Sequence, residues 1–147
     1  MIRAFVPAAI VVALAAPVAQ ASDALKSVVS SYLQIQTQLA ADKMDGVKAS
    51  AAEIAKNAAQ LEGGKAIAAS ANELEKAGDL RKARAAFGKL SDAVIAAVKS
   101  SSADAEGLKL GFCPMVNASW LQKDGQVRNP YYGSAMLTCG ELKDPKK

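Results

Sequence analysis

Sulfur-containing residues that can bind metals cluster in the last third of the chain. Cys113 and Cys139 are the only cysteines, and Met115 and Met136 lie close to them in sequence. Cys113 and Met115 are two residues apart, so in an extended segment both side chains would point to the same side. Met136 and Cys139 are three residues apart and would share one face of a helical turn. The spacing therefore predicts two clips whose four sulfur atoms can converge on one point.

Such a ligand set suits only certain ions. Thiolates and thioethers select soft ions such as Cu(I) over Mg²⁺ or Ca²⁺, and Ag(I) follows by the same softness. The chain has no histidine, which removes the commonest ligand for zinc and Cu(II). Pro114 favours an extended Cys113, because proline disfavours helical angles in the residue before it. These residues point to a Cu(I) or Ag(I) site made of Cys113, Met115, Met136 and Cys139.

The same residues have a simpler interpretation, which the sequence leaves open. A Cys113–Cys139 disulfide would close a loop of about 27 residues, which in the chain-entropy treatment is worth roughly 3–4 kcal/mol of stability. Trp120, Tyr131 and Tyr132 would then serve as the hydrophobic anchor of this segment. Alternatively, Trp120 would cover a bound ion as a cation–π lid. An oxidised resting form and a reduced metal-binding form are compatible with each other.

Several classes of function find no support in the sequence. It contains no histidine, glycine-rich phosphate loop, G-x-S-x-G or C-x-x-C pattern, so we expect a protein that is not an enzyme. The net charge is +4, and basic residues alternate with acidic ones instead of forming a patch. This arrangement is typical of a solvated helical surface and gives no support for nucleic-acid binding.

The first 21 residues are typical of a secretory signal peptide. Arg3 precedes a short apolar run, and Ala19-Gln20-Ala21 has the small-x-small pattern of a cleavage site. We therefore expect cleavage after Ala21, a periplasmic protein, and no membrane span after cleavage. Residues 22–147 would form a single domain that includes a sulfur-rich tail at 107–143.

Residues 22–100 have the periodicity of helices. Breaks near 42–46, 62–64 and 78 divide them into four, with Ser22 and Asp79 as N-caps of the first and last. Short connections favour a mainly α fold, an antiparallel up-and-down four-helix bundle. Frequent proline and glycine predict a tail of turns and short strands packed on the bundle, with one helical turn near 134–137.

Twelve residues of the tail form a long, specific pattern, made of Cys113, Pro114, Met115, Trp120, Asn129, Pro130, Tyr131, Tyr132, Gly133, Met136, Cys139 and Gly140. This pattern resembles the signature of a bacterial periplasmic family of domains of unknown function. Domains of that family also occur fused to copper/silver efflux membrane-fusion (adaptor) proteins. The resemblance implies a Cu(I) or Ag(I) function, with an efflux adaptor or another envelope protein as partner. The alternative is a non-enzymatic interaction module whose disulfide-closed tail docks on an envelope partner.

Overall fold

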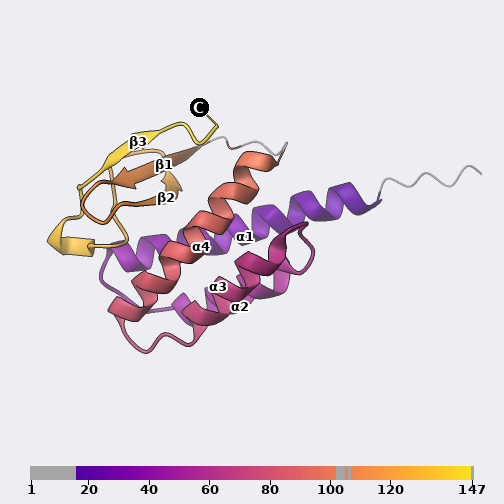
Figure 1. The fold of residues 1–147 in the computed structure, drawn as a ribbon, viewed down its shortest axis with the longest axis horizontal. Coiled ribbons are helices and arrows are strands. Elements are labelled where there is room, and N and C mark those ends of the chain that lie inside the picture. Colours follow the sequence, from indigo (N-terminus) through magenta and orange to yellow (C-terminus); the bar gives the residue numbers. More distant parts are fainter. Residues whose placement is uncertain (1–15, 102–104, 106, 147) are drawn as a thin grey trace, which may run out of the picture.

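Four helices come first in the chain, and a small sheet follows them (Figure 1). The computed structural model describes residues 16–101, 105 and 107–146. The expected signal peptide falls mostly on residues 1–15, outside the described residues. The elements are α1 (Ala16–Ala40), α2 (Val47–Ala58), α3 (Gly64–Glu75), α4 (Leu80–Ser100), β1 (Leu108–Cys113), β2 (Ala118–Lys123), the 3₁₀ helix η1 (Gly133–Ala135) and β3 (Glu141–Lys143).

Residues with special backbone or capping properties mark the starts of three helices. Gly46 and Gly63 precede α2 and α3 with a left-handed φ of 70°, which glycine adopts at little cost. Asp79 caps α4 by accepting a hydrogen bond from the N–H of Lys82 at 2.9 Å. The predicted breaks between the helices are therefore confirmed.

The first helix begins earlier than expected. We predicted an N-cap at Ser22, but α1 starts at Ala16 and passes through Ser22 in the intact chain. The residues before Ser22 are rich in alanine, which has the highest helix propensity. The predicted cap is therefore wrong, because a good capping residue does not end a helix when helix formers precede it.

The helices form the predicted four-helix bundle. Consecutive helices pack against one another and run in alternate directions (Figure 1). α1 and α4 pack less closely, and β2 lies against both. No helix among the described residues is long and apolar enough to cross a membrane. The largest fully buried helical side chains are Val28, Tyr32, Ile35, Leu39, Val47, Ile54, Leu74, Phe87, Leu90 and Val94.

Tyr32 joins the bundle to the sheet. Its ring is fully buried and stacks on Phe87 of α4, with 5.0 Å between the ring centroids. Its hydroxyl lies 2.6 Å from Ser91 Oγ and accepts the main-chain N–H of Leu121 in β2 at 3.1 Å. Burial raises the pKa of Tyr32 far above its usual range, so the hydroxyl stays protonated. One side chain thus connects α1, α4 and the edge of the sheet.

The sheet has the strand order β2-β1-β3, and both pairings are antiparallel. A four-residue turn, 114–117, joins β1 to β2. Leu110 and Leu121 are paired across these strands and belong to the core shared with the helices. Side chains alternate along a strand, so the next pair, Gly111 and Trp120, lies on the other face of the sheet. The second face of the sheet therefore needs its own cover, and the residues after β2 provide it.

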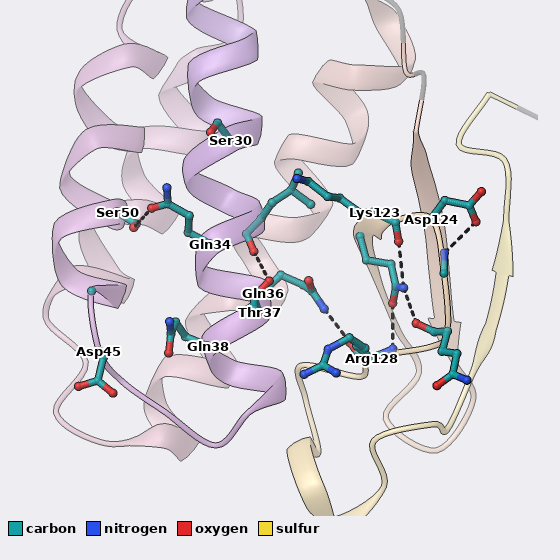
Figure 2. Close-up of a pocket in the computed structure, with 15 residues that line it drawn as sticks. Ser30, Gln34, Gln36, Thr37, Gln38, Asp45, Ser50, Lys123, Asp124 and Arg128 are labelled. Atoms are coloured by element: carbon teal, nitrogen blue, oxygen red, sulfur yellow. Dashed lines mark hydrogen bonds between the residues drawn. The ribbon is translucent and has the colours of Figure 1, made fainter.

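A polar groove lies between α1, the start of α2 and residues 122–128 (Figure 2). Its volume is about 570 Å³. Gln122 holds the 122–128 segment in shape, since its amide donates to the carbonyl of Gln126 at 2.9 Å and accepts the N–H of Arg128 at 3.0 Å. Gln36 of α1 donates to the carbonyl of Arg128 at 2.7 Å. A hydrogen bond thus joins α1 to the 122–128 segment at the base of the groove.

Candidate functional site

The structure brings the two cysteines together. Cys113 ends β1 and is fully buried, whereas Cys139 lies just before β3 and is half-buried. Their Sγ atoms are 2.9 Å apart, and both are free thiols. Strand pairing explains this proximity, because Phe112 lies opposite Glu141 in the antiparallel register. Cys113 therefore faces the residues that directly precede β3.

The distance between the sulfurs limits what the pair can do. It is longer than the bond of a disulfide, which is about 2.05 Å, so small movements would close the bridge. It is shorter than the roughly 3.8 Å that separates two thiolates sharing a tetrahedral ion with bonds of about 2.3 Å. A metal held by both thiolates would therefore push the sulfur atoms apart by about 1 Å.

Polar groups surround the thiol of Cys113 and lower its pKa. Burial raises the pKa of its thiol, but hydrogen bonds from Cys139, the N–H groups of Val116 and Met115 and the Asn129 side chain outweigh burial. The net result is a pKa below the ordinary value. The hydrogen bond to Cys113 is the main cause that raises the pKa of Cys139. The pair is therefore unequal, with Cys113 favoured as the thiolate and Cys139 as the thiol that donates to it.

Asn129 organises the surroundings of both cysteines. It is fully buried, and its amide nitrogen donates to the carbonyl of Cys139 at 2.9 Å. Its amide oxygen accepts the N–H of Tyr131 at 2.8 Å and that of Tyr132 at 3.3 Å. The Asn-Pro-Tyr-Tyr stretch is therefore a turn that Asn129 closes with its own side chain. The turn also sets the position of the cysteine pair.

The structure places the two methionines differently from the predicted clips. Met115 lies on the 114–117 turn with 66% of its surface exposed, while Cys113 is buried. The predicted extended form of 113–115 is therefore wrong, because the chain turns at Pro114 to form the hairpin. The helical turn near 134–137 is shorter than predicted, since η1 ends at Ala135.

Met136 precedes Cys139 by three residues, and a hydrogen bond connects the two. Its carbonyl accepts the N–H of Cys139 at 3.0 Å, which closes a turn between them. Met136 is half-buried. Within the described residues, no three or more His, Cys, Asp or Glu side chains form a group that could hold a metal ion. Any metal at this point would thus depend on two thiolates and on thioether sulfur.

Trp120 packs on the second face of the sheet. It is fully buried, and its indole N–H donates to Gln122 Oε1 at 3.0 Å. The ring lies directly over Gly111, where any larger side chain would collide with it. Tyr131 meets it edge-on, with centroids 6.1 Å apart. Trp120 thus extends the core of the helices into the space between the sheet and the residues that carry Asn129.

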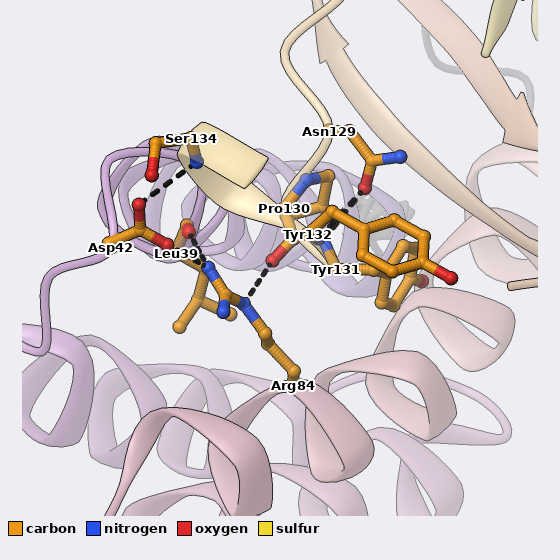
Figure 3. Close-up of polar contacts among 8 residues, drawn as sticks. All are labelled: Leu39, Asp42, Arg84, Asn129, Pro130, Tyr131, Tyr132 and Ser134. Atoms are coloured by element: carbon orange, nitrogen blue, oxygen red, sulfur yellow. Dashed lines mark hydrogen bonds and ion pairs between the residues drawn. The ribbon is translucent and has the colours of Figure 1, made fainter. Parts of the chain in front are cut away.

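Arg84 of α4 anchors the tail to the bundle (Figure 3). Its guanidinium donates to the carbonyls of Pro130 at 2.9 Å and Leu39 at 2.8 Å. It also pairs with Asp42 at 2.6 Å, and Asp42 accepts the N–H of Ser134 at 2.9 Å. Arg84 therefore ties three separate parts of the chain together at one point.

Gly133 fits tightly against this anchor. Its φ of 56° is left-handed, and a Cβ at this position would collide with Asp42 and Arg84. Glycine is therefore required here both for backbone freedom and for space.

Asp42→Asn should destabilise the protein at neutral pH, and the difference from the wild type should narrow as the pH falls toward 2. Hydrogen bonds from Ser134 and Arg84 lower the pKa of Asp42 to about 2. A lowered carboxyl pKa stabilises the fold above the unfolded pKa, and this contribution disappears as the pH falls through the folded pKa. Asparagine also tolerates the left-handed φ of 57° at this position. Urea unfolding of both proteins at pH 7, 4 and 2.5 measures the difference.

The matched control for this experiment is Asp92→Asn, at an exposed position on α4. It should show little loss of stability at neutral pH. A gap between Asp42→Asn and wild type that stays constant from pH 7 to pH 2.5 would contradict a role for the Asp42 charge.

Sequence reasoning missed three residues that build the site. Asp42 and Arg84 are 42 positions apart in sequence, and no local pattern connects them. Gln122 reads as an ordinary polar strand residue, yet it is almost fully buried under four hydrogen bonds. The available signal for Gln122 was its place two residues after Trp120, on the same strand face.

Comparison with known protein families gives a match to most of the helical bundle. A profile described as "Protein of unknown function (DUF3347)" matches residues 28–106. The matched part spans the bundle from within α1 through α4, and it ends before β1. Searches of curated proteins and of solved structures each gave no match.

Proposed function

Since the chain belongs to the DUF3347 family of proteins of unknown function, we propose a function from the site itself: the Cys113–Cys139 pair binds one Cu(I) or Ag(I) ion. The observation that supports this proposal best is the 2.9 Å contact between the two sulfurs. Two convergent thiol groups in a chain without histidine are suited to soft ions and poorly suited to hard ones.

The hydrogen bonds around Cys113 support the proposal. A metal-bound thiolate keeps negative charge, and a buried charge is costly unless polar groups satisfy it. The N–H groups of Met115 and Val116 and the Asn129 side chain already lower the pKa of Cys113. They would stabilise the thiolate without any rearrangement of the turn, as outer-shell partners do in other metal sites.

Binding and release would proceed by ligand exchange. Cys139 is the more exposed thiol, so it would meet an arriving ion and lose its proton. Met136 follows η1 and Met115 lies on an exposed turn, so a thioether from either residue would have to turn toward the cysteines to complete the coordination. In this proposal the protein is exported to the periplasm, where it sequesters the ion or passes it to an efflux adaptor or another envelope protein.

The reduced protein should take up one Cu(I) per chain in competition with a chromogenic Cu(I) chelator. Cys113→Ser and Cys139→Ser should each abolish uptake. Met136→Leu and Met115→Leu should weaken affinity by about tenfold or more if the thioether is a ligand, equivalent to ~1.4 kcal/mol. Leucine preserves size and apolarity, so the stability loss should stay below about 1.5 kcal/mol.

Met44→Leu is the matched control, because Met44 packs against the bundle in the loop between α1 and α2. It should not affect Cu(I) affinity. Equal affinity in wild type and in both tail methionine variants would remove the thioethers from the site. Absence of Cu(I) uptake by the reduced wild type would refute the metal function.

A disulfide-closed interaction module is the second candidate, and the same 2.9 Å distance favours it. In that case the protein would purify with Cys113 and Cys139 oxidised, and alkylation under denaturing conditions would label neither. Reduction would then lower thermal stability without conferring Cu(I) binding. The two candidates are thus distinguished by the titration of reduced protein.

A further inference from the structure

The polar groove of Figure 2 has no part in the cysteine site. Its lining includes one apolar side chain, Leu33, and otherwise consists of polar or charged residues and glycine. Its volume of about 570 Å³ lies within the usual range for ligand sites, roughly 300–1,000 Å³. No local sequence pattern indicates this groove, because the residues on its two sides are more than seventy positions apart in the chain.

The floor of the groove is a row of hydrogen-bonding side chains on α1. Ser30, Gln34 and Gln38 line it at four-residue steps, so each is about 6 Å further along the helix axis than the last. Gln34 Oε1 accepts a hydrogen bond from Ser50 at 3.0 Å, which orients its amide N–H groups. Gln38 has no side-chain hydrogen bond to the residues that the structure describes. An extended peptide repeats every two residues, or about 6.6–6.8 Å, and so matches this row.

The 122–128 side of the groove carries two basic side chains, Lys123 and Arg128. The backbone of Arg128 is fixed on both sides, by Gln122 at its N–H and by Gln36 at its carbonyl. Its guanidinium nevertheless forms no ion pair within the described part of the chain, and neither does the ammonium of Lys123. Arg128 is therefore a cation on a rigid support without a carboxylate partner, and guanidinium binds carboxylates in a bidentate manner.

Two acidic residues also line the groove, but they are placed differently. Asp124 is turned into its own loop, where its Oδ1 accepts the N–H of Gly125 at 2.9 Å. Asp45 lies on the α2 side of the groove, beside Gly46 at the start of α2. The groove thus has amides along its floor and unpaired positive charge on one wall.

We propose that this groove binds an extended, acidic peptide segment of a partner protein. The amides of Gln34 and Gln38 pair with the peptide backbone, and Arg128 and Lys123 bind acidic side chains at alternate positions. This inference is independent of metal binding, because none of these residues contacts the cysteine pair.

A synthetic peptide tests the proposal directly. Acetyl-Gly-Glu-Gly-Glu-Gly-Glu-Gly-amide places its carboxylates on one side when extended. Titration into the ¹⁵N-labelled protein should shift the side-chain amide signals of Gln34 and Gln38 and the signals of residues 123–128. Arg128→Gln should lower the association constant by about tenfold, the effect expected for a lost charged hydrogen bond. Gln34→Ala with Gln38→Ala should lower it by a similar factor.

Matched controls separate specific binding from general attraction. Arg81→Gln, at an exposed position on α4, should change the association constant by less than about twofold. Equal loss in Arg81→Gln and Arg128→Gln would overturn the proposal, as would equal binding of the peptide with Gln in place of Glu. Tricarballylate that binds as tightly as the peptide would also overturn it, because a small acid would then be the ligand.

Discussion

Trp120→Ala should lower the free energy of unfolding by about 3–5 kcal/mol, the usual cost of removing a large aromatic side chain from a packed core. The indole fills the space between the sheet and the tail, fully buried against Gly111 and edge-on to Tyr131. Truncation would also leave Gln122 Oε1 without the indole N–H that it accepts. Urea unfolding followed by circular dichroism at a helical wavelength measures the effect on the whole domain.

Two glycine substitutions provide a test of this packing from the other side. Gly111→Ala places a methyl group into the Trp120 ring, and such overpacking costs roughly 1–3 kcal/mol. Gly78→Ala, between α3 and α4, meets nothing within 4 Å and should be neutral or slightly stabilising. A Gly111→Ala protein as stable as Gly78→Ala would mean that Trp120 does not lie over β1.

Phe87→Ala is expected to cost a similar amount, about 3–5 kcal/mol. Phe87 is fully buried on α4. Its ring lies between Tyr32, at 5.0 Å between centroids, and Tyr131, at 5.8 Å. Its removal would therefore create a cavity at the point where the bundle meets the tail. The free energy of unfolding and the chemical shifts of the two tyrosine rings report on this cavity.

Phe112 provides the control for Phe87. It is also a phenylalanine, but it lies on β1 with 37% of its surface exposed. Phe112→Ala should therefore cost much less than Phe87→Ala. Equal effects of the two substitutions would show that Phe87 does not lie in a packed core.

Local signals were sufficient to predict the helical half of the protein. Gly46, Gly63 and Asp79 lie where the chain needs a left-handed residue or a cap, and such needs are decided within a few residues. The helical periodicity of residues 22–100 and its three breaks then predicted the number and order of the helices. The N-cap predicted at Ser22 is wrong because capping preference is a local tendency, and the helix-forming residues before Ser22 override it.

The composition of the tail predicted turns and short strands, but it did not predict how they are arranged in space. Pro114 predicts an extended segment, whereas in the structure it begins the turn between β1 and β2. Whether Cys113 and Met115 share a side depends on where the strand ends, and strand ends are fixed by pairing with distant residues. The contact of Cys113 with Cys139 follows from the register of β1 with β3.

Residues that hold the tail on the bundle were beyond a local analysis for the same reason. Arg84 bonds to Leu39, Asp42 and Pro130, which come from α1, the following loop and the tail. Arg84 and these three partners matter because they meet at one point and hold the tail on the bundle. An exposed-looking arginine on an amphipathic helix has no local property that distinguishes it from Arg81 or Lys82.

The position of the single tryptophan gives the protein an internal spectroscopic probe. Trp120 is shielded from water, and its ring touches Gly140, the neighbour of Cys139. Its emission should be blue-shifted in the native state and should arise from one environment only. Nearby disulfides and soft metal ions quench indole fluorescence, so oxidation or ion binding at the cysteines would be visible as a change in intensity. The intrinsic fluorescence of the unlabelled protein can therefore follow events at the cysteine pair in real time.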